Sequence, residues 1–398
     1  MKAKWSILSG LLLAAGLTGP LAQAQEKVKI GFVTDMSGLY ADAEGKNGAV
    51  AIQMAIDDFG GKALGQPIEL FTADHQNKAD IAATKAREWV DTQGVTLLFS
   101  GTNSATALAV AQVAHEKKRV NFNNGAGGSQ LTNEQCNPYT IHYDFDSVAL
   151  AKGTGSAVVD QGGKTWFFLT ADYAFGQALE ADTSTVIKAK GGQILGSVKH
   201  PLNASDFSSF LLQAQNSKAQ ILGLANAGGD TINSIKAAKE FGIDKTMKIA
   251  SLLVYLSDVH SLGLKNAEGL LHTTSWYWDL NEQTRKFGER FHAKTGRMPD
   301  DVQAADYSAT MNYLKAVEAV KTADSDKVMA YLKSHPIDDF FGKGVIRPDG
   351  TFAHDMYLAQ VKTPAESKRP WDYLKILQTL PADSVWTTKA ETKCSLWK

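Results

Sequence analysis

The sequence predicts an α/β protein with two lobes, each built on a parallel sheet covered by helices. In residues 28–59 an alternating apolar strand, a polar loop that contains glycine and an amphipathic helix follow one another. This strand-loop-helix unit recurs in two successive runs along the chain. A length of 398 residues with 44% apolar content exceeds what a single core usually serves. Two lobes of similar construction are therefore expected.

The first run of strands and helices builds the first lobe. Its loop at residues 34–40 leaves the carboxyl end of the first strand, which is where open α/β sheets bind their ligands. The alternation of strand and helix predicts a parallel sheet. The expected elements are the strand 29–33, the helix that ends at 59, the strand 68–72, the helix 81–93, the strand 95–99, the helix 104–117, the strand 120–122 and an extended exit at 139–143.

The second run begins at residue 147 and leads into three late helices. These helices have too little strand around them to form their own sheet, so we expect them to pack on the first lobe. The tail from residue 363 is rich in proline, lysine and aromatic residues and is expected to be irregular. The expected elements are helices 147–161, 176–190, 206–215 and 230–241, strands 165–170, 193–198, 219–224, 248–253 and 270–274, late helices 281–294, 302–321 and 325–333, and a last strand 355–362 that joins the second lobe.

The N-terminus has the pattern of a secretory signal peptide. Lys2 and Lys4 precede an apolar run at 7–17, and Ala22-Gln23-Ala24 follows it, which predicts a signal peptide over residues 1–24 with cleavage after Ala24. The alternative, a membrane-spanning helix, is disfavoured because the run is short and interrupted by glycine. No cysteine stands at the cleavage site to carry a lipid. The mature protein is therefore expected to be freely soluble outside the cytoplasm.

Charge and cysteine content limit the partners and indicate the redox setting. The net charge is −1, and removal of Lys2 and Lys4 with the signal peptide leaves −3, with both signs scattered, so nucleic acid is not an expected partner. The two cysteines, Cys136 and Cys394, belong to an exported chain, in which disulfides persist. We expect them to form a bridge that holds the tail to the body; two unpaired thiols are the alternative.

No motif carries the residues of an enzyme. The segment Gly162 to Thr165 resembles the end of a phosphate-binding loop, but Val158 stands where that loop needs a glycine. The segment Gly125 to Gly128 resembles part of a dinucleotide-binding loop, although Gln130 replaces its third glycine. The nine histidines are dispersed, and no Gly-x-Ser-x-Gly motif occurs. The chain is therefore expected to be a binding protein with no catalytic residue, metal or cofactor.

Polar, glycine and aromatic residues follow the predicted strands of both lobes. Hydroxyls, amides and free N–H groups beside the start of a helix form a suitable site for a carboxylate. Two alternatives stay open: Asn103 and Ser104 are equally suited to capping their helix, and an aromatic trio at a strand end is as often core as ligand cage. The segments are 37–40, 100–104 and 123–129 in the first lobe, and 172–175, 226–230 and 276–278 in the second.

Six segments together resemble one known family. They are VKIGFVTDMSG with the helix after it, GTNSATALAVAQVA, NNGAGGSQLT, DYAFGQALE, LANAGGDTINSIKAAKEFG and AEGLL. In this order they resemble the type I periplasmic solute-binding proteins of ABC importers, in the branch of the leucine/isoleucine/valine-binding proteins, over essentially the whole mature chain. The resemblance implies two Rossmann-like lobes joined by three hinge strands, near 139–143, 273–276 and 345–352. The implied division is a signal peptide 1–24, a first lobe of 25–141 plus 276–346, a second lobe of 142–275 plus 347–362, and a tail 363–398.

The resemblance also implies a ligand site between the lobes. Tyr40 is expected to cover the ligand, and Ser104 with Gly125 and Gly127 to hold its carboxylate. Amino-acid binders of the family have a glutamate for the ligand's ammonium where this sequence has Leu252, and Asp258 lies further along. A buried ammonium without a carboxylate partner is costly. The expected ligand-binding set is Ser37, Tyr40, Thr102, Asn103, Ser104, Asn124, Gly125, Gly127, Asp172, Tyr173, Phe175, Ala227, Gly228, Leu252, Tyr255 and Trp276.

The missing glutamate favours a ligand without an ammonium group. The sequence resembles a subset of the family that binds aromatic carboxylates such as hydroxybenzoates, cinnamates and aryl keto acids, whose rings would contact Tyr40, Tyr173, Phe175, Tyr255 and Trp276. The expected function is a periplasmic receptor that captures a small aromatic or apolar carboxylate and presents it, as a monomer, to the membrane permease of an ABC importer. The rivals are a branched-chain amino acid or small amide binding protein of the same family, and a ligand-sensing domain partnered with a membrane receptor.

Overall fold

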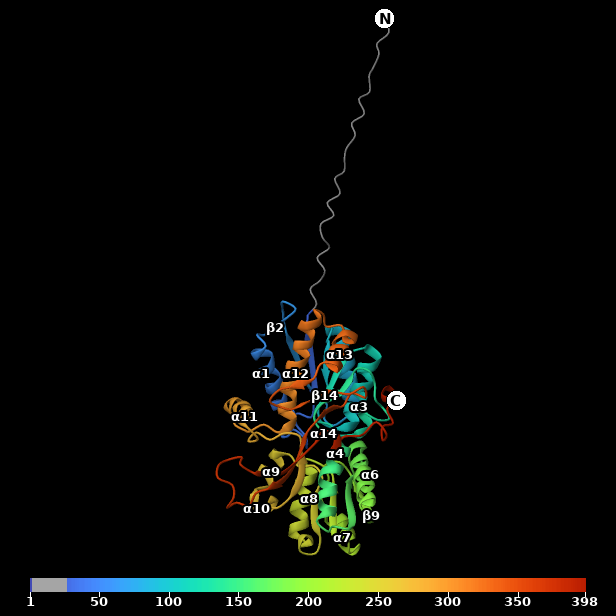
Figure 1. Ribbon diagram of the computed structural model, residues 1–398, viewed down its shortest axis with the longest axis vertical. Helices are drawn as coiled ribbons and strands as arrows, with labels where there is room; N and C mark the ends of the chain where they lie inside the picture. Colours follow the sequence, from blue (N-terminus) through green and yellow to red (C-terminus); the bar gives the residue numbers. More distant parts are fainter. Residues whose placement is uncertain (2–26) are drawn as a thin grey trace.

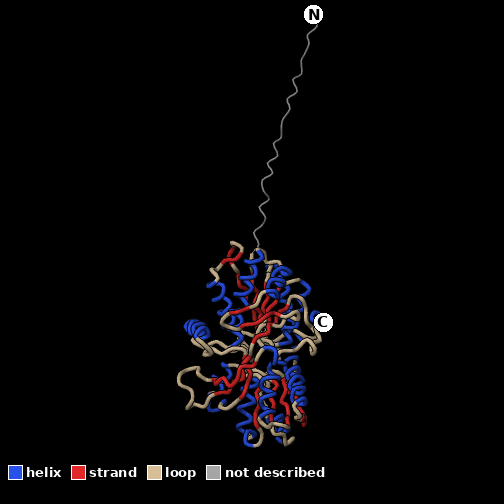
Figure 2. The backbone as a smooth tube through the Cα atoms, viewed as in Figure 1, coloured by secondary structure: helices blue, strands red, loops and turns tan. Residues whose placement is uncertain are grey.

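The computed structural model of the protein describes Met1 and residues 27–398 and has two lobes stacked along its long axis (Figure 1). Strands lie at the centre of each lobe with helices around them (Figure 2). The predicted α/β fold with one parallel sheet in each lobe is confirmed. The predicted signal peptide falls outside the described residues. Within the part of the chain that the structure describes, no helix is both long enough and apolar enough to cross a bilayer.

The sheet of the first lobe has five strands in the order β4-β1-β5-β6-β7, and all of its pairings are parallel. Its central strands are short apolar runs, and Ile30 and Phe32 of β1 are fully buried. Helices cover the sheet, so the loops that link strands to helices are left at its carboxyl edge. The elements are β1 (Lys29–Thr34), α1 (Gly45–Asp58), β4 (Glu69–Asp74), α2 (Ala79–Glu88), β5 (Leu97–Phe99), α3 (Ser104–Lys117), β6 (Val120–Asn123) and β7 (Thr140–His142).

The sheet of the second lobe has four parallel strands in the order β11-β10-β8-β9. Trp166 and Phe168 of β8 are buried at its centre and stack with ring centroids 5.9 Å apart. As in the first lobe, the loops that begin the helices gather at the carboxyl ends of the strands. The elements are β8 (Thr165–Ala171), α6 (Ala174–Ala189), β9 (Gln193–His200), α7 (Ser208–Asn216), β10 (Ile221–Ala225), α8 (Gly229–Glu240) and β11 (Lys248–Ser251).

The late helices stand beside the first lobe, where α12 lies along α1 (Figure 1). The Tyr307 hydroxyl of α12 donates to Asp58 Oδ2 (2.6 Å), and Arg290 of α11 pairs with the same carboxylate. Because these helices follow the second lobe in sequence, the chain crosses back between the lobes before they begin. They are α11 (Glu282–Thr295), α12 (Asp301–Val320) and α13 (Ser325–Ser334).

Two small antiparallel sheets accompany the crossings. One has the order β12-β16-β17, and the other has the order β13-β14-β15. Where the crossing segments meet, the Ser275 hydroxyl after β12 donates to Asp144 Oδ1 after β7, and His354 Nε2 lies 2.9 Å from the Asp144 carbonyl oxygen. These contacts hold three crossing segments together at the hinge. The strands are β12 (Leu271–Thr274), β13 (Ile337–Asp338), β14 (Lys343–Ile346), β15 (Phe352–His354), β16 (Met356–Val361) and β17 (Leu374–Leu380).

Two predicted helices are interrupted by π-helical turns. The helix expected over 81–93 is α2 followed by a π turn at Trp89–Gln93. The helix expected over 147–161 divides into α4 (Ser147–Leu150), a π turn at Ala151–Gly155 and α5 (Ser156–Asp160). The second turn packs against β12 so closely that a Cβ on Gly153 would lie 2.2 Å from Thr273 Oγ1. A tertiary contact of this kind leaves no trace in the helical periodicity.

Several short elements were not expected from the sequence, among them two helices and two strands. The helices α9 (Leu256–Leu262) and α10 (Leu264–Ala267) follow β11, where the apolar run conceals the end of the strand. Asp258 marks the start of α9, because its Oδ2 accepts a hydrogen bond from Tyr255 N (3.1 Å). The strands β2 (Lys62–Ala63) and β3 (Gln66–Pro67) form a two-residue hairpin pairing outside the main sheet.

The expectation of an irregular tail is wrong for Leu374–Leu380. This segment is β17, which pairs with the edge of β16 and alternates buried Leu374 with exposed Lys375. The alternation is visible in the sequence, but proline, lysine and aromatic residues around it obscure the signal. After β17 the chain forms α14 (Ala382–Val385) and returns to the first lobe.

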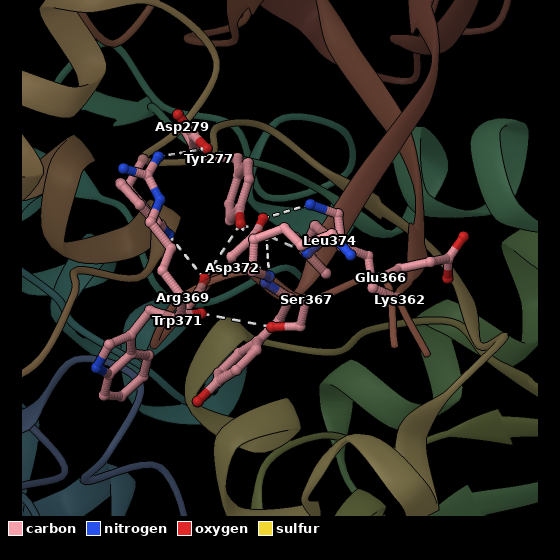
Figure 3. Close-up of polar contacts among 12 residues, drawn as sticks. Tyr277, Asp279, Lys362, Glu366, Ser367, Arg369, Trp371, Asp372 and Leu374 are labelled. Carbon is pink, nitrogen blue, oxygen red and sulfur yellow. Dashed lines mark hydrogen bonds and ion pairs between the residues drawn. The ribbon is translucent and has the colours of Figure 1, made fainter. Parts of the chain in front are cut away.

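The loop between β16 and β17 is held on the segment that follows β12 (Figure 3). The Trp371 carbonyl accepts hydrogen bonds from Tyr277 Oη (3.1 Å) and Trp278 Nε1 (2.9 Å). Arg369 pairs with Asp279 (2.8 Å) and lies over the Trp278 ring, 4.6 Å from its centroid. Tyr277 and Trp278 of the aromatic segment 276–278 therefore anchor this loop. For these two residues the alternative of a structural core role holds, rather than that of a ligand cage.

The predicted disulfide between Cys136 and Cys394 is present. It joins residues separated by 258 positions and attaches the end of the tail to the loop that follows β6. Lys393 supports the junction, since its backbone N–H donates to Asn133 Oδ1 (3.2 Å) and its Nζ pairs with Glu134 (2.6 Å).

The double substitution Cys136→Ser with Cys394→Ser is expected to lower the free energy of unfolding by about 2–5 kcal/mol, because the unfolded chain regains the freedom of a very long loop. Urea unfolding of the oxidised protein measures the change. Treatment of the wild type with a reductant is the control and should bring its midpoint to that of the double variant. An unchanged midpoint in the double variant contradicts the prediction.

Candidate functional site

A small cavity lies between the two lobes at the carboxyl ends of their strands. The empty space among its lining residues, part of which is open to solvent, is about 200 Å³. Its lining residues are Tyr40, Asn103, Ser104, Gly125, Ala126 and Gly127 from the first lobe and Tyr173, Phe175, Ala227, Leu253 and Tyr255 from the second.

The loop after β1 places Tyr40 across the cavity. The Asp35 carboxylate accepts hydrogen bonds from Gly38 N (2.6 Å), Tyr40 N (3.0 Å) and Asn77 Nδ2 (2.7 Å), which fix the turn. The Tyr40 hydroxyl then hydrogen-bonds the Tyr173 hydroxyl of the second lobe. Burial raises the pKa of both phenols, so both remain protonated at neutral pH and can donate or accept.

The start of α3 provides N–H groups to the cavity. Asn103 has a positive φ of 77°, and its side chain accepts from Ala105 N (2.9 Å) and Thr106 N (3.3 Å), so it caps the helix. Ser104 Oγ accepts from Gly128 N (3.0 Å). Among the described residues, the backbone N–H groups of Ser104 and Gly127 form no hydrogen bond. The Ser104 donor at the N-terminus of α3 and the Gly127 donor on the loop after β6 are suited to a carboxylate.

Glycine is required where the two walls approach each other. A Cβ on Gly127 would lie 2.7 Å from Phe145 Cε2 and 2.8 Å from Phe175 Cε2. A side chain there would therefore displace aromatic rings of the cavity wall. The bare backbone leaves the Gly127 N–H accessible to a ligand.

The second-lobe wall is aromatic and uncharged. Tyr173 and Phe175 lie with ring centroids 6.2 Å apart, and Tyr255 lies the same distance from Phe145. Burial raises the pKa of Tyr255, so this phenol also stays protonated. No residue that lines the cavity has a carboxylate, ammonium, guanidinium or imidazole group. The cavity thus offers rings, hydroxyls and backbone donors, but no counter-ion for a charged amine.

The lobes touch directly, so the structure is a closed form. Gly229 N at the start of α8 donates to Leu39 O (3.1 Å). The Ser129 hydroxyl of the first lobe donates to Asp182 Oδ2 of α6 (2.9 Å). Gly228 has a positive φ of 56°, and a Cβ there would lie 2.5 Å from Leu39 O.

Much of the predicted site comes together in this cavity. Ala126 lines the cavity and lies within the candidate segment 123–129, although the expected ligand-binding set did not include it. Leu253 also lines it and was not predicted, but it is next to the predicted Leu252. Leu252 instead points into the core and is fully buried. The predicted residues that line the cavity are Tyr40, Asn103, Ser104, Gly125, Gly127, Tyr173, Phe175, Ala227 and Tyr255.

Other predicted residues lie outside the cavity lining. Asp172 is exposed and pairs with Lys199 (3.2 Å). Ser37 donates to Asp74 Oδ2 (2.5 Å). Trp276 donates to the Phe340 carbonyl (3.1 Å), as part of an aromatic core. Thr102, Asn124 and Gly228 stand behind lining residues. Asp258 and Asp230, further acids near this wall, accept backbone N–H groups and do not line the cavity.

Comparison with known proteins gives one consistent family. The sequence profile described as periplasmic binding protein matches residues 27–368. A periplasmic binding protein from Burkholderia mallei is 65% identical, with a TM-score of 0.93 over 94% of this chain and 100% of that one. A structure from Burkholderia xenovorans, described as a branched-chain amino acid ABC transporter periplasmic ligand-binding protein, is 41% identical, with a TM-score of 0.83 and the same coverage.

More distant relatives differ in the ligands that their descriptions give. A Leu/Ile/Val-binding protein homologue from Brucella melitensis is 25% identical over 68% of this chain and 70% of its own length. A solute-binding protein from Rhodopseudomonas palustris, solved with 3,4-dihydroxybenzoic acid, is 23% identical, with a TM-score of 0.80 over 89% of this chain and 98% of that one. The latter likeness shows the shared fold.

The substitution Gly228→Ala is expected to open the two lobes, because its Cβ would overlap Leu39 O and the residue needs a positive φ. Small-angle X-ray scattering should show a larger radius of gyration than in the wild type. Gly229→Ala is the matched control, since a Cβ at Gly229 meets Leu39 at 3.5 Å, an ordinary contact. Equal radii for the two variants would show that the Leu39 contact does not govern closure.

Proposed function

This chain belongs to the periplasmic binding protein family, and from that premise we propose that it captures a small aromatic or apolar carboxylate for the membrane permease of an ABC importer. Substrate-binding proteins of ABC transporters bind small molecules and work with membrane permeases. What we add to this general function is the chemical class of the ligand. We further propose that the protein acts in the periplasm after cleavage near Ala24, with lobes 25–141 plus 276–346 and 142–275 plus 347–362 as the closing bodies.

The observation that carries the proposal is the absence of any charged side chain among the residues that line the cavity. An amino acid bound there would bury its ammonium without a carboxylate partner, at a cost of several kcal/mol. A carboxylate alone needs only donors, which Ser104 and Gly127 offer through their backbone N–H groups. The lining thus supports an anion that carries an apolar body.

The aromatic wall supports a ring as that apolar body. Tyr40 of the first lobe and Tyr173, Phe175 and Tyr255 of the second line the same cavity as the N–H donors. Offset or edge contacts with such rings contribute beyond simple burial. Because the tyrosines are protonated, their hydroxyls are also partners for a hydroxyl on the ligand's ring. Benzoates solved with distant relatives have this chemistry.

The proposed mechanism follows from closure of the lobes. The ligand docks on the N–H donors of the first lobe, and the aromatic wall of the second lobe then closes over it. Contacts that exist only when both walls are engaged shift the population toward the closed form. The closed form is the state that the permease is proposed to recognise.

A second candidate ligand is a branched-chain amino acid or a small amide. The descriptions of the Brucella and Burkholderia xenovorans relatives favour it. An amino acid would require an acidic side chain near its ammonium group. Beside the end of β11, however, the cavity is lined by Leu253.

A thermal-shift panel distinguishes the two ligands. Benzoate, 4-hydroxybenzoate, cinnamate and phenylpyruvate are expected to raise the melting temperature, because a ligand at a hundred times its Kd stabilises the folded state by about 2.7 kcal/mol. Leucine, valine and benzamide are expected to have no effect. Stabilisation by leucine or valine alone contradicts the proposal and supports the amino-acid function.

The substitution Leu253→Glu tests the uncharged lining directly. A carboxylate at this position should repel an anionic ligand and weaken the binding of the panel's best carboxylate by roughly tenfold or more. Leu253→Gln, which has the same shape without the charge, is the control for lost packing. Isothermal titration calorimetry measures both affinities. If the two variants bind equally well, the charge of the lining does not decide the ligand.

A further inference from the structure

A pair of buried carboxyl groups lies behind the N–H donors of the cavity. Glu44, at the end of the loop after β1, and Asp306 of α12 are both fully buried. Glu44 Oε2 accepts hydrogen bonds from Thr102 N (2.8 Å) and from the Thr34 hydroxyl. Asp306 Oδ1 accepts from Asn124 Nδ2 (2.7 Å). Each carboxyl therefore holds one of the two loops that end in cavity-lining residues.

The side chains of both acids lie against one glycine of α1. A Cβ on Gly48 would lie 2.6 Å from Asp306 Oδ2 and 3.0 Å from Glu44 Cγ, so a larger residue would displace one of them. The Glu44 carboxyl also lies directly behind the cavity, since a Cβ on Gly125 would be 3.2 Å from Glu44 Cδ. The second oxygen of each acid, Glu44 Oε1 and Asp306 Oδ2, has no hydrogen-bond partner among the described residues.

The charged groups that act on this pair are themselves acidic. They are Asp35 on the loop after β1 and Asp144 at the hinge. The His75 ring hydrogen-bonds the Thr102 carbonyl (2.8 Å) and neither carboxyl. Within the described chain no group of three or more acidic, histidine or cysteine side chains converges as a metal site. A proton on either carboxyl would lower the negative charge of the pair.

Electrostatics agree with this geometry. Burial raises the pKa of Glu44 to about 7, although the hydrogen bonds that it accepts from Thr34 and Thr102 act in the opposite direction. Burial, and then the charge of Glu44, raise the pKa of Asp306 well above its ordinary value.

We propose that Glu44 and Asp306 are positioning residues that hold the Thr102 and Asn124 loops in place and that, by taking up protons in their buried site, make the binding of an anionic ligand depend on pH. The ligand part of this inference rests on the proposed function; the proton uptake by the pair does not. An anion bound in front of Gly125 favours the protonated pair. By linkage, its affinity falls as the pH rises and the pair loses its proton to solvent.

The ligand-free protein tests the proton uptake by Glu44. Because the folded-state pKa of Glu44 is raised from 4.5 to about 7, its contribution to stability is complete below pH 4.5 and is lost as the pH rises through 7. The Glu44→Gln variant has no titrating group at this position, so it should not lose stability in this way. The unfolding constant of the wild type relative to this variant should rise by roughly 70-fold between pH 5 and pH 8.

Glu318→Gln on α12, the helix that carries Asp306, is the matched control, because hydrogen bonds from Leu64 N and Lys321 lower the pKa of this carboxyl below its ordinary value. The ratio of its unfolding constant to that of the wild type should stay constant between pH 5 and pH 8. If the same ratio for Glu44→Gln changes no more than it does for the control, the inference is overturned. Asp306→Asn provides a second variant in case Glu44→Gln does not fold.

Benzoate is the probe for the ligand part. Calorimetry at pH 7 in buffers of different ionisation enthalpy should show that the wild type takes up protons when benzoate binds. The Kd for benzoate should be roughly tenfold higher at pH 8 than at pH 6. Glu44→Gln should bind without proton uptake. Binding of benzoate with a pH-independent Kd overturns the inference and leaves the proposed function standing. Failure of the whole carboxylate panel to bind overturns the proposed function, and the ligand-free ratio still decides whether the pair holds a proton.

Discussion

The cavity exists because loops from two different lobes touch each other directly. Gly229 N donates to Leu39 O, and the Tyr40 hydroxyl meets the Tyr173 hydroxyl. A hydrogen bond between neutral groups contributes only about 1 kcal/mol net, so these contacts hold the closed form weakly. A ligand that contacts both walls adds enough to change the population, which is how a binding protein signals that it is loaded.

The fold and the first-lobe side of the site could be predicted because parallel sheets obey a positional rule. Tyr40, Ser104 and Gly127 each follow a strand, and the carboxyl ends of parallel strands share one edge. The choice between Leu252 and Leu253 could not be predicted in this way. β11 ends at Ser251, and beyond it the backbone has no period that assigns alternate residues to opposite faces. Packing of the loop decides which leucine faces the cavity.

The aromatic trio shows a different limit of sequence reasoning. Trp276 packs in a core, and Trp278 donates to the carbonyl of Trp371, 93 positions away. An aromatic ring with a polar atom suits either a ligand or a distant backbone group. The local sequence does not show which of these partners the ring contacts. Here the partner is supplied by the tail, whose strand β17 was not predicted because of the composition of the segment around it.

The cavity and the acids behind it answer one physical problem together. Backbone donors bind an anion well only if they are held rigidly, and the loops that carry them need acceptors behind them. A protonated carboxyl can still accept hydrogen bonds from these loops, and it places less negative charge there than a carboxylate would. If the ligand is the proposed aromatic carboxylate, the donors orient the anion and the ring supplies affinity, since a ring that hides about 150 Å² gains about 4 kcal/mol. Such a site would discriminate by ring burial and by the absence of an ammonium.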